Sequence, residues 1–237
     1  MIPIRDANPT TRRAYVTYGL VALNVAAFVL WQPLTGTPND QARFFYCYGS
    51  IPKEVLSFEP LRDVAIICGG KSVVFSLFAS MFIHGGWLHL GGNMLFLWIF
   101  GNNVEDRMGP VAYLAFYLFA GLVATYAQVA TDPSSTIPQI GASGAIAGVL
   151  GAYLVLFPHA RVLTLVIFFF ITMVELPAVV VLGLWFVLQA FQGVGELGAG
   201  AAGGVAWFAH IGGFLAGVVI AFLFYRRPTA APRYLSP

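Results

Sequence analysis

The sequence predicts an all-α polytopic membrane protein of six transmembrane helices, with a membrane-embedded loop between the first and second helices. Of the 237 residues, 59% are hydrophobic and only 9% are charged, whereas a soluble domain carries roughly 25% charged residues. The mean hydropathy is +0.80, and six stretches of 20 or more residues contain no formal charge. A helix needs about 20 apolar residues to cross a bilayer core of roughly 30 Å.

The same composition excludes several classes of protein. Disorder requires low hydrophobicity and high net charge, and this chain has neither. The net charge is only +2 and the sequence has no basic run, so we expect no nucleic acid as a partner. The expected surroundings are the lipid bilayer.

The charge-free stretches place the six helices one after another along the chain. A transmembrane sheet is disfavoured, because backbone exposed to lipid must satisfy its hydrogen bonds internally and the stretches lack the alternation of a barrel. The run 162–174 is too short to cross the bilayer, and we expect an interfacial or re-entrant segment there. The predicted spans are residues 14–32, 87–104, 111–130, 143–158, 176–192 and 205–225.

The distribution of Lys and Arg orients these spans. An even number of spans places both termini on one side, and this side holds eight of the 12 basic residues. Cytoplasmic segments carry the excess of Lys and Arg. We therefore divide the chain into a cytoplasmic N-terminal segment (1–13), a membrane domain (14–225) and a cytoplasmic C-terminal tail (226–237).

The segment between the first two spans, residues 33–86, is too apolar and aromatic for a free linker. We expect it to pack as a structured, partly membrane-embedded cap on the outer side. Cys47 and Cys68 lie in this cap, where a disulfide is chemically possible. Two buried free thiols remain the alternative, because the sequence does not give the separation of the two residues.

Polar side chains inside membrane spans are functional candidates. Ser143 and His89 each lie 18 residues from the cytoplasmic charge of their span, and His210 lies 16 residues from its own. At 1.5 Å per residue, all three are about 24–27 Å above the cytoplasmic boundary. Three spans thus place these groups in one layer near the outer face, with Asn93 one helical turn deeper than His89.

This set of side chains permits acyl transfer. The hydroxyl of Ser143 becomes a nucleophile when an imidazole removes its proton, and His210 is the candidate base. His89, the Asn93 amide and the backbone N–H of Ser143 can stabilise an oxyanion. No carboxylate shares the layer, so we expect a dyad without an orienting acid. A metal site is disfavoured because no carboxylate, cysteine or H-x-x-x-H pair accompanies the histidines.

Small residues support the predicted contact between spans four and six. Gly141 and Gly144 permit a tight turn into the fourth span. Gly213 and Gly217 form a small-residue face one turn after His210, which allows close packing of helices. His84, which precedes the second span, is expected to have a structural role.

Four motifs are arranged in order over residues 14–225. They are H-x-x-x-N at His89 and Asn93, V-E-x-R-x-G at 104–109, G-x-S-G at 141–144 and A-H-x-x-G-x-x-x-G at 209–217. With these motifs the chain resembles the rhomboid family of intramembrane serine proteases.

The resemblance implies a six-transmembrane-helix rhomboid-like bundle. It also implies that Ser143 is the nucleophile, that His210 is the base, and that His89 and Asn93 stabilise the oxyanion, without a cofactor. The implied substrates are transmembrane proteins cleaved near the outer membrane boundary, and substrate access in the family involves the fifth span and the cap.

Two positions depart from the family pattern. Bacterial members often have an aromatic residue four positions after the serine, where this chain has Ala147, so His210 is expected to contact another ring, from Trp207 or Phe208. The first loop also lacks a Trp-Arg pair found in some members.

Two other functions are alternatives to the protease. One is an inactive rhomboid-like protein that binds membrane clients, although such proteins usually lack the dyad. The other is a channel or transporter, which predicts polar sites at the midplane in two related halves. The short termini favour a bacterial plasma membrane, whereas the substrate and the oligomeric state remain open.

Overall fold

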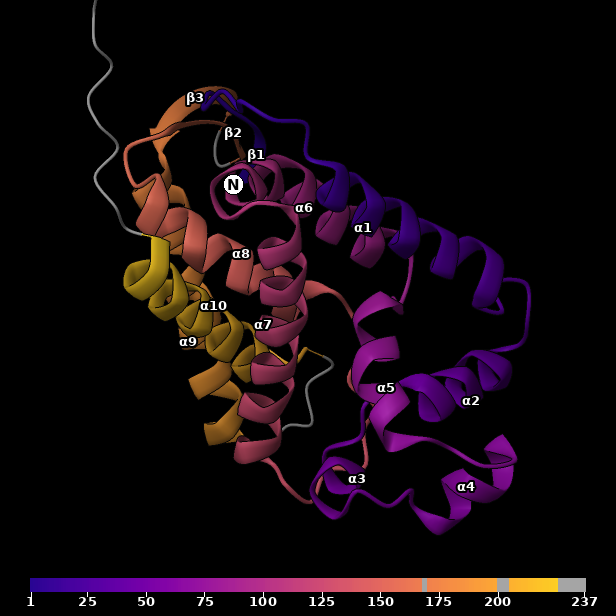
Figure 1. The fold of residues 1–237 in the computed structure, drawn as a ribbon. Helices are drawn as coiled ribbons and strands as arrows, with labels where there is room; N and C mark the ends of the chain where they lie inside the picture. Colours follow the sequence, from indigo (N-terminus) through magenta and orange to yellow (C-terminus); the bar gives the residue numbers. More distant parts are fainter. Residues whose placement is uncertain (168–169, 200–204, 226–237) are drawn as a thin grey trace, which may run out of the picture.

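The computed structural model describes residues 1–167, 170–199 and 205–225 (Figure 1). These residues form a predominantly helical protein with a small sheet at one end. The predicted C-terminal tail, 226–237, lies outside the described residues.

Six long or apolar helices correspond to the six predicted spans. Their ends lie within four residues of the predictions, except that the fifth helix ends seven residues later. The helices are α1 (Tyr15–Ala26, continued by a π-helical turn, Ala27–Trp31), α6 (Trp87–Met108), α7 (Pro110–Thr131), α8 (Ser143–Leu156), α9 (Ala178–Ala199) and α10 (Trp207–Ile220, continued by a π-helical turn, Ala221–Tyr225).

Three of the described helical segments are long and apolar enough to cross a membrane, namely Pro110–Thr131, Ala178–Gly195 and Trp207–Tyr225. The count reaches four if Arg62–Cys68 and Val73–Phe82, which meet at an angle of 74°, form one broken span. Two further apolar helical segments, Tyr15–Trp31 and Ser143–Leu156, are shorter. The chain is therefore a polytopic helical membrane protein.

The segment between α1 and α6 folds into four short helices, which we call the cap. They are α2 (Pro38–Tyr48), α3 (Pro52–Ser57), α4 (Arg62–Cys68) and α5 (Val73–Ala79, followed by a 3₁₀ turn, Ser80–Phe82). Cys47 of α2 and Cys68 of α4 form a disulfide, with their Cα atoms 5.5 Å apart. The alternative of two free thiols is therefore wrong.

A buried ion pair holds the cap together. The Nζ atom of Lys71 lies 2.6 Å from Oε2 of Glu54, and both side chains are fully buried. Lys71 also donates hydrogen bonds to the backbone carbonyls of Tyr46 and Gly49. Burial lowers the pKa of Lys71, and its bond to Glu54 opposes this shift. One ammonium thus joins the end of α2 to α3 and to the start of α5.

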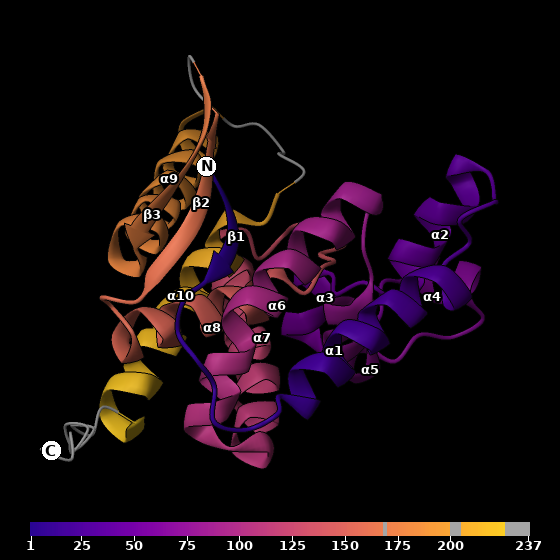
Figure 2. The same ribbon diagram turned by 90° about the horizontal axis from the view of Figure 1, so that it is seen from above.

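A three-stranded antiparallel sheet corrects the all-α prediction. Its strands are β1 (Ile2–Asp6), β2 (Arg161–Ile167) and β3 (Ile171–Pro177), in the order β1-β2-β3. The described residues of 162–174 therefore lie mainly in the paired strands β2 and β3, and the interfacial or re-entrant position expected for this segment stays a prediction. The segment is rich in β-branched residues, which favour strands, and the N-terminal segment supplies a third strand. Figure 1 shows the sheet at the end of the bundle opposite α3 and α4, and Figure 2 shows β2 and β3 beside α9.

The glutamate of the V-E-x-R-x-G motif, Glu105, has a structural role. Glu105, at the end of α6, is buried and accepts hydrogen bonds from the backbone N–H groups of Val16 and Thr17 at 3.0 and 2.7 Å. A carboxylate at a helix N-terminus satisfies free N–H groups and interacts favourably with the helix dipole. Glu105 therefore fixes the start of α1 against the end of α6.

The helix α8 lies at the centre of the bundle and packs closely on α10. A Cβ atom at Gly217 would overlap the carbonyl oxygen of Gly148, and one at Gly213 would overlap the carbonyl oxygen of Gly144. A Cβ at Gly151 would likewise overlap a backbone carbonyl of α10. The absence of side chains at these positions lets the two backbones approach, as the small-residue pattern predicted.

Candidate active site

Ser143 and His210 are in direct contact. Ser143 is the first residue of α8, His210 lies in the first turn of α10, and the serine Oγ is 2.8 Å from Nε2 of the imidazole. Both residues are half-buried. The glycine contacts between the two helices hold these ends together, so the backbone packing sets the distance between the side chains.

The turn into α8 requires glycine at position 141. The φ angle of Gly141 is +121°, a conformation that L-amino acids rarely adopt. A Cβ there would also lie 2.8 Å from Nε2 of His89. The N–H of Gly141 is bonded to the carbonyl of Ser80 at 2.9 Å. The turn therefore brings the backbone around Ser143 against the ring of His89.

The hydrogen bonding of His89 defines its tautomer. Its Nδ1 accepts a hydrogen bond from the N–H of Gly85 at 3.1 Å. A neutral imidazole that accepts at Nδ1 carries its proton on Nε2. The Nε2 atom is the one that faces Gly141, so a donor N–H points at the turn that carries Ser143.

Asn93 is buried one turn along α6 from His89. Its amide nitrogen donates to the carbonyl of His89 at 2.8 Å. This bond uses one of the two amide N–H groups and leaves the second. The structure shows no hydrogen bond between the described side chains of Asn93 and Ser143.

Two residues of α9 that the sequence analysis did not select complete the surroundings of His210. The Oε1 atom of Gln189 lies 2.6 Å from Nδ1 of the imidazole. The Trp185 ring lies one helical turn away, with its centroid 6.0 Å from that of His210. The expected contact with Trp207 is present at 6.1 Å, with the rings perpendicular. The sequence signal that could have identified Gln189 is its position as an uncharged polar residue within the apolar run 176–195.

A small cavity of about 30 Å³ lies beside Ser143. A cavity of this volume is large enough to hold a water molecule. Thr125 and Gln139 contribute polar groups to its wall, and the amide nitrogen of Gln139 is buried with no hydrogen-bond partner among the described residues. The nucleophile therefore borders a space that has polar groups in its wall and can hold a water molecule.

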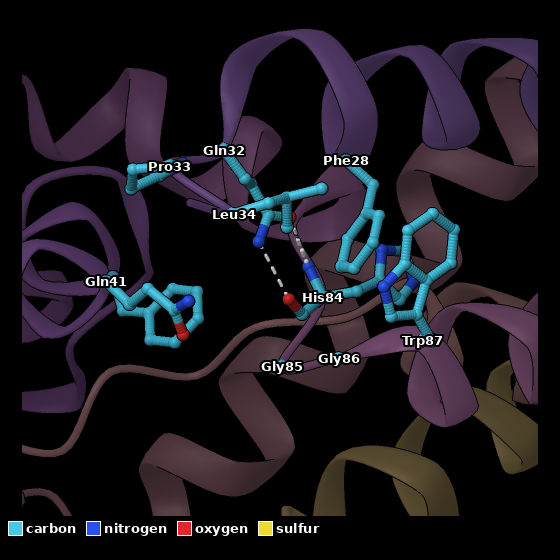
Figure 3. A pocket seen from close by; sticks show the side chains of 10 residues that line it. Phe28, Gln32, Pro33, Leu34, Gln41, His84, Gly85, Gly86 and Trp87 are labelled. Atoms are coloured by element: carbon cyan, nitrogen blue, oxygen red, sulfur yellow. Dashed lines mark hydrogen bonds between the residues drawn. The ribbon is translucent and has the colours of Figure 1, made fainter. Parts of the chain in front are cut away.

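His84 fixes the start of α6 through its backbone, as Figure 3 shows. The Gln32 side chain donates to the His84 carbonyl and accepts from its N–H, both at 2.8 Å. The His84 ring is fully buried, 5.1 Å from the ring of His89 between centroids, and neither nitrogen has a partner among the described residues. His84 also borders a cavity of about 160 Å³ between α1, α2 and α6. These hydrogen bonds involve only the backbone of His84, so the structural role expected for its side chain stays a prediction.

Together these features define a polytopic helical membrane protein in which two tightly packed helices join a serine to a histidine. The chain belongs to the rhomboid family. The family profile described as the Rhomboid domain matches residues 71–227, which include all four residues proposed for the chemistry.

Curated relatives come from several kingdoms. RHOMBOID-like protein 5 of Arabidopsis thaliana is 32% identical over 98% of this chain and 76% of its own length. Rhomboid protein 1, mitochondrial, of Saccharomyces cerevisiae is 29% identical over 86% of this chain, which spans about half (51%) of the yeast protein. Rhomboid protease GluP of Bacillus subtilis is 31% identical over 58% of this chain and 24% of its own length.

Proposed function

We propose that this protein is an intramembrane serine endopeptidase that hydrolyses peptide bonds of transmembrane proteins near the outer membrane boundary. The observation that carries the proposal is the 2.8 Å contact between Ser143 Oγ and His210 Nε2. Family membership and the relative named a rhomboid protease support it. The proposed reaction requires no cofactor and no metal ion.

In the first half of the reaction, Ser143 Oγ attacks the carbonyl carbon of the substrate while its proton passes to His210 Nε2. The tetrahedral intermediate collapses when the C–N bond breaks, and His210 gives its proton to the leaving amine. An acyl ester on Ser143 remains. In the second half, a water attacks the ester, again with His210 as base, and the proton returns to Ser143 as the acid product leaves.

The negative oxygen of each intermediate needs nearby hydrogen-bond donors. We assign this role to the Nε2–H of His89, the second amide N–H of Asn93 and the backbone N–H of Ser143. The first turn of α8 adds the positive end of its helix dipole. Gly141 keeps the space between His89 and Ser143 free of a side chain, which supports placing the substrate carbonyl there.

The length of α8 supports a site below the membrane surface. We propose that α1, α6, α7, α8, α9 and α10 are six spans. With 14 residues, α8 is about 21 Å long, shorter than a bilayer core of roughly 30 Å. If its C-terminal end lies at the cytoplasmic boundary, Ser143 lies about 10 Å below the outer one.

The cap and its disulfide support the same orientation. We place the cap on the outer side and the sheet with Arg5 and Arg161 in the cytoplasm, in agreement with the distribution of basic residues. The bond between Cys47 and Cys68 then lies where disulfides persist. In a bacterial plasma membrane, the compartment expected from the sequence, the substrate is cut on its outer side.

The full chain in detergent micelles tests the proposal with a single-span substrate and a fluorophosphonate probe. We expect the wild type to cleave the substrate and to be labelled on Ser143. Ser143→Ala should abolish both substrate cleavage and labelling while the melting temperature is unchanged. His210→Ala should abolish labelling. Ser134→Ala, which removes an exposed serine, is the matched control and keeps both activities.

Two outcomes would contradict the proposal. The first is cleavage by Ser143→Ala at the wild-type rate. The second is a wild type that binds the substrate but neither cleaves it nor reacts with the probe, which is the behaviour of an inactive client-binding protein.

A further inference from the structure

The imidazole of His210 has a hydrogen-bond partner at each nitrogen, and the two partners lie on different helices. Nε2 contacts Ser143 of α8 at 2.8 Å, whereas Nδ1 contacts the side-chain oxygen of Gln189 on α9 at 2.6 Å. Gln189 is half-buried and lies 21 residues before the histidine. The ring is thus held at both ends, although no carboxylate contacts it among the described residues.

The oxygen of Gln189 can only accept a hydrogen bond. A neutral imidazole has one N–H, so the ring must place its proton on Nδ1 to bond to this oxygen. Nε2 is then unprotonated and accepts the proton of Ser143, which is the arrangement that a general base requires. The opposite tautomer would place an N–H against the serine hydroxyl and could not remove its proton.

We propose that Gln189 is a positioning residue that holds His210 in the tautomer and orientation needed to activate Ser143. This inference rests on the proposed function and adds a third member to its dyad. The amide carries no formal charge and is much less costly to desolvate within a membrane than a carboxylate would be. Gln189 therefore replaces the acid that the polar layer lacks.

The packing of α9 on α10 supports this role, because it fixes where the amide lies. Trp185 is four residues before Gln189, on the same helix face, and its ring lies near His210. Phe186 stacks on Phe214 of α10 with centroids 4.6 Å apart. A Cβ at Gly193 would lie 3.1 Å from the Cβ of Trp207, so the next turn is also in close contact. Gln189 lies between these contacts.

Gln189→Leu removes the acceptor with little change in side-chain volume, and Gln192→Leu makes the same replacement at an exposed position of α9. We expect Gln189→Leu to slow fluorophosphonate labelling of Ser143 and to lower kcat by at least about tenfold, with KM and the melting temperature nearly unchanged. Gln192→Leu should label at the wild-type rate.

Gln189→Glu provides the conservative rescue. It restores an acceptor for Nδ1, so labelling should recover to at least the wild-type rate at high pH. The new carboxylate favours the protonated imidazole, which moves the acidic limb of the pH–rate profile to higher pH. His89 on α6 is the other titratable side chain that acts on His210, and it is the same in every variant.

Nitrogen-15 NMR of labelled histidine gives a readout that does not depend on activity. The His210 signals are those that disappear in His210→Ala. In the wild type we expect a protonated Nδ1 and an unprotonated Nε2, and in Gln189→Leu a mixture of both tautomers.

The two proposals fail in different ways. If the wild type is labelled on Ser143 and Gln189→Leu matches it in rate and tautomer, the role of Gln189 is refuted while the protease remains. A Gln189→Glu variant as slow as Gln189→Leu at every pH would also refute this role. If the wild type itself is not labelled and cleaves nothing, the proposed function fails and this inference fails with it.

Discussion

Gly217 of α10 lies directly against the backbone carbonyl of Gly148 on α8, in a contact that leaves no space for a Cβ atom. This contact occurs one turn beyond the equivalent contact between Gly213 and Gly144, which is next to the candidate nucleophile. The distance between Ser143 and His210 therefore depends on residues that have no side chains and take no part in the chemistry.

Gly217→Ala should move α10 away from α8. We expect a loss of about 1–3 kcal/mol of stability, typical of overpacking, and a larger loss of labelling at Ser143, because the Ser–His contact lengthens. Thermal unfolding and the labelling rate measure the two effects. Gly183→Ala on α9 is the control, since a Cβ at that position meets nothing within 4 Å. Wild-type behaviour of Gly217→Ala would show that the helices are not held by this contact.

Asn93→Ala tests the oxyanion site. Removal of one oxyanion donor typically lowers kcat by about 10²–10³-fold, because the bond is strongest in the transition state. We expect a loss in this range with little change in KM, measured by steady-state cleavage. Asn102→Ala, at a half-buried position of the same helix, serves as the comparison. An unchanged kcat in Asn93→Ala would show that Asn93 is not an oxyanion donor and that its hydrogen bond to the His89 carbonyl is only structural.

The buried pair in the cap predicts an asymmetric response to mutation. Lys71→Met leaves the carboxylate of Glu54 buried without its partner, which typically costs about 3–5 kcal/mol. Replacing both residues by Met and Leu should recover much of this loss, because no buried charge remains. Thermal unfolding of the single and double variants measures the difference. Equal destabilisation in both would show that the carbonyl contacts of Lys71 matter more than the charge.

The hydrogen bonds at the start of α2 predict that the stability of the protein decreases at acid pH. The N–H and hydroxyl of Thr37 both donate to Asp40, at 2.8 Å, and these bonds hold the pKa of Asp40 below its ordinary value. The Asp40 carboxylate therefore contributes its full stabilisation above its ordinary pKa, which applies in the unfolded chain. This stabilisation is lost as the pH falls through the lowered pKa of the folded protein. Asp40→Ala should melt earlier than the wild type at pH 7. The difference in melting temperature should begin to shrink near the ordinary pKa, about 4, and should vanish only below the lowered pKa of Asp40. Glu59→Ala, which removes an exposed acid of the same cap, is the control for the change in net charge.

The charge-free runs predicted the positions of the long helices, and counting from the charges placed Ser143 and His210 at one depth. Both depend on the cost of charge in lipid, which acts on the local sequence. The sheet was missed because β1 and the β2–β3 hairpin are more than 150 residues apart in the chain, and apolar strands resemble a membrane segment in composition. The disulfide was left open because composition does not give the distance between Cys47 and Cys68.

Gln189 and Trp185 were missed for a related reason. The polar layer predicted from the charges includes only groups of the second, fourth and sixth spans, whereas Gln189 lies in the fifth span and belongs to none of the four motifs. Its importance appears only when α9 packs on α10 and the amide meets the second nitrogen of His210. The expected ring contact from Trp207 is confirmed, and Trp185 of α9 adds a second ring near His210.

The sheet also fixes the first turn of α9. Strand β3 runs directly into Ala178, whose N–H bonds to the carbonyl of Ala160, so the first turn of α9 is pinned. Gln189 lies about 16 Å from Ala178 along the axis of α9. At this distance a tilt of α9 by about 10° about Ala178 would correspond to a displacement of the amide by roughly 3 Å, more than the 2.6 Å that separates it from His210. The contact between Gln189 and His210 therefore depends on the angle at which the sheet holds α9.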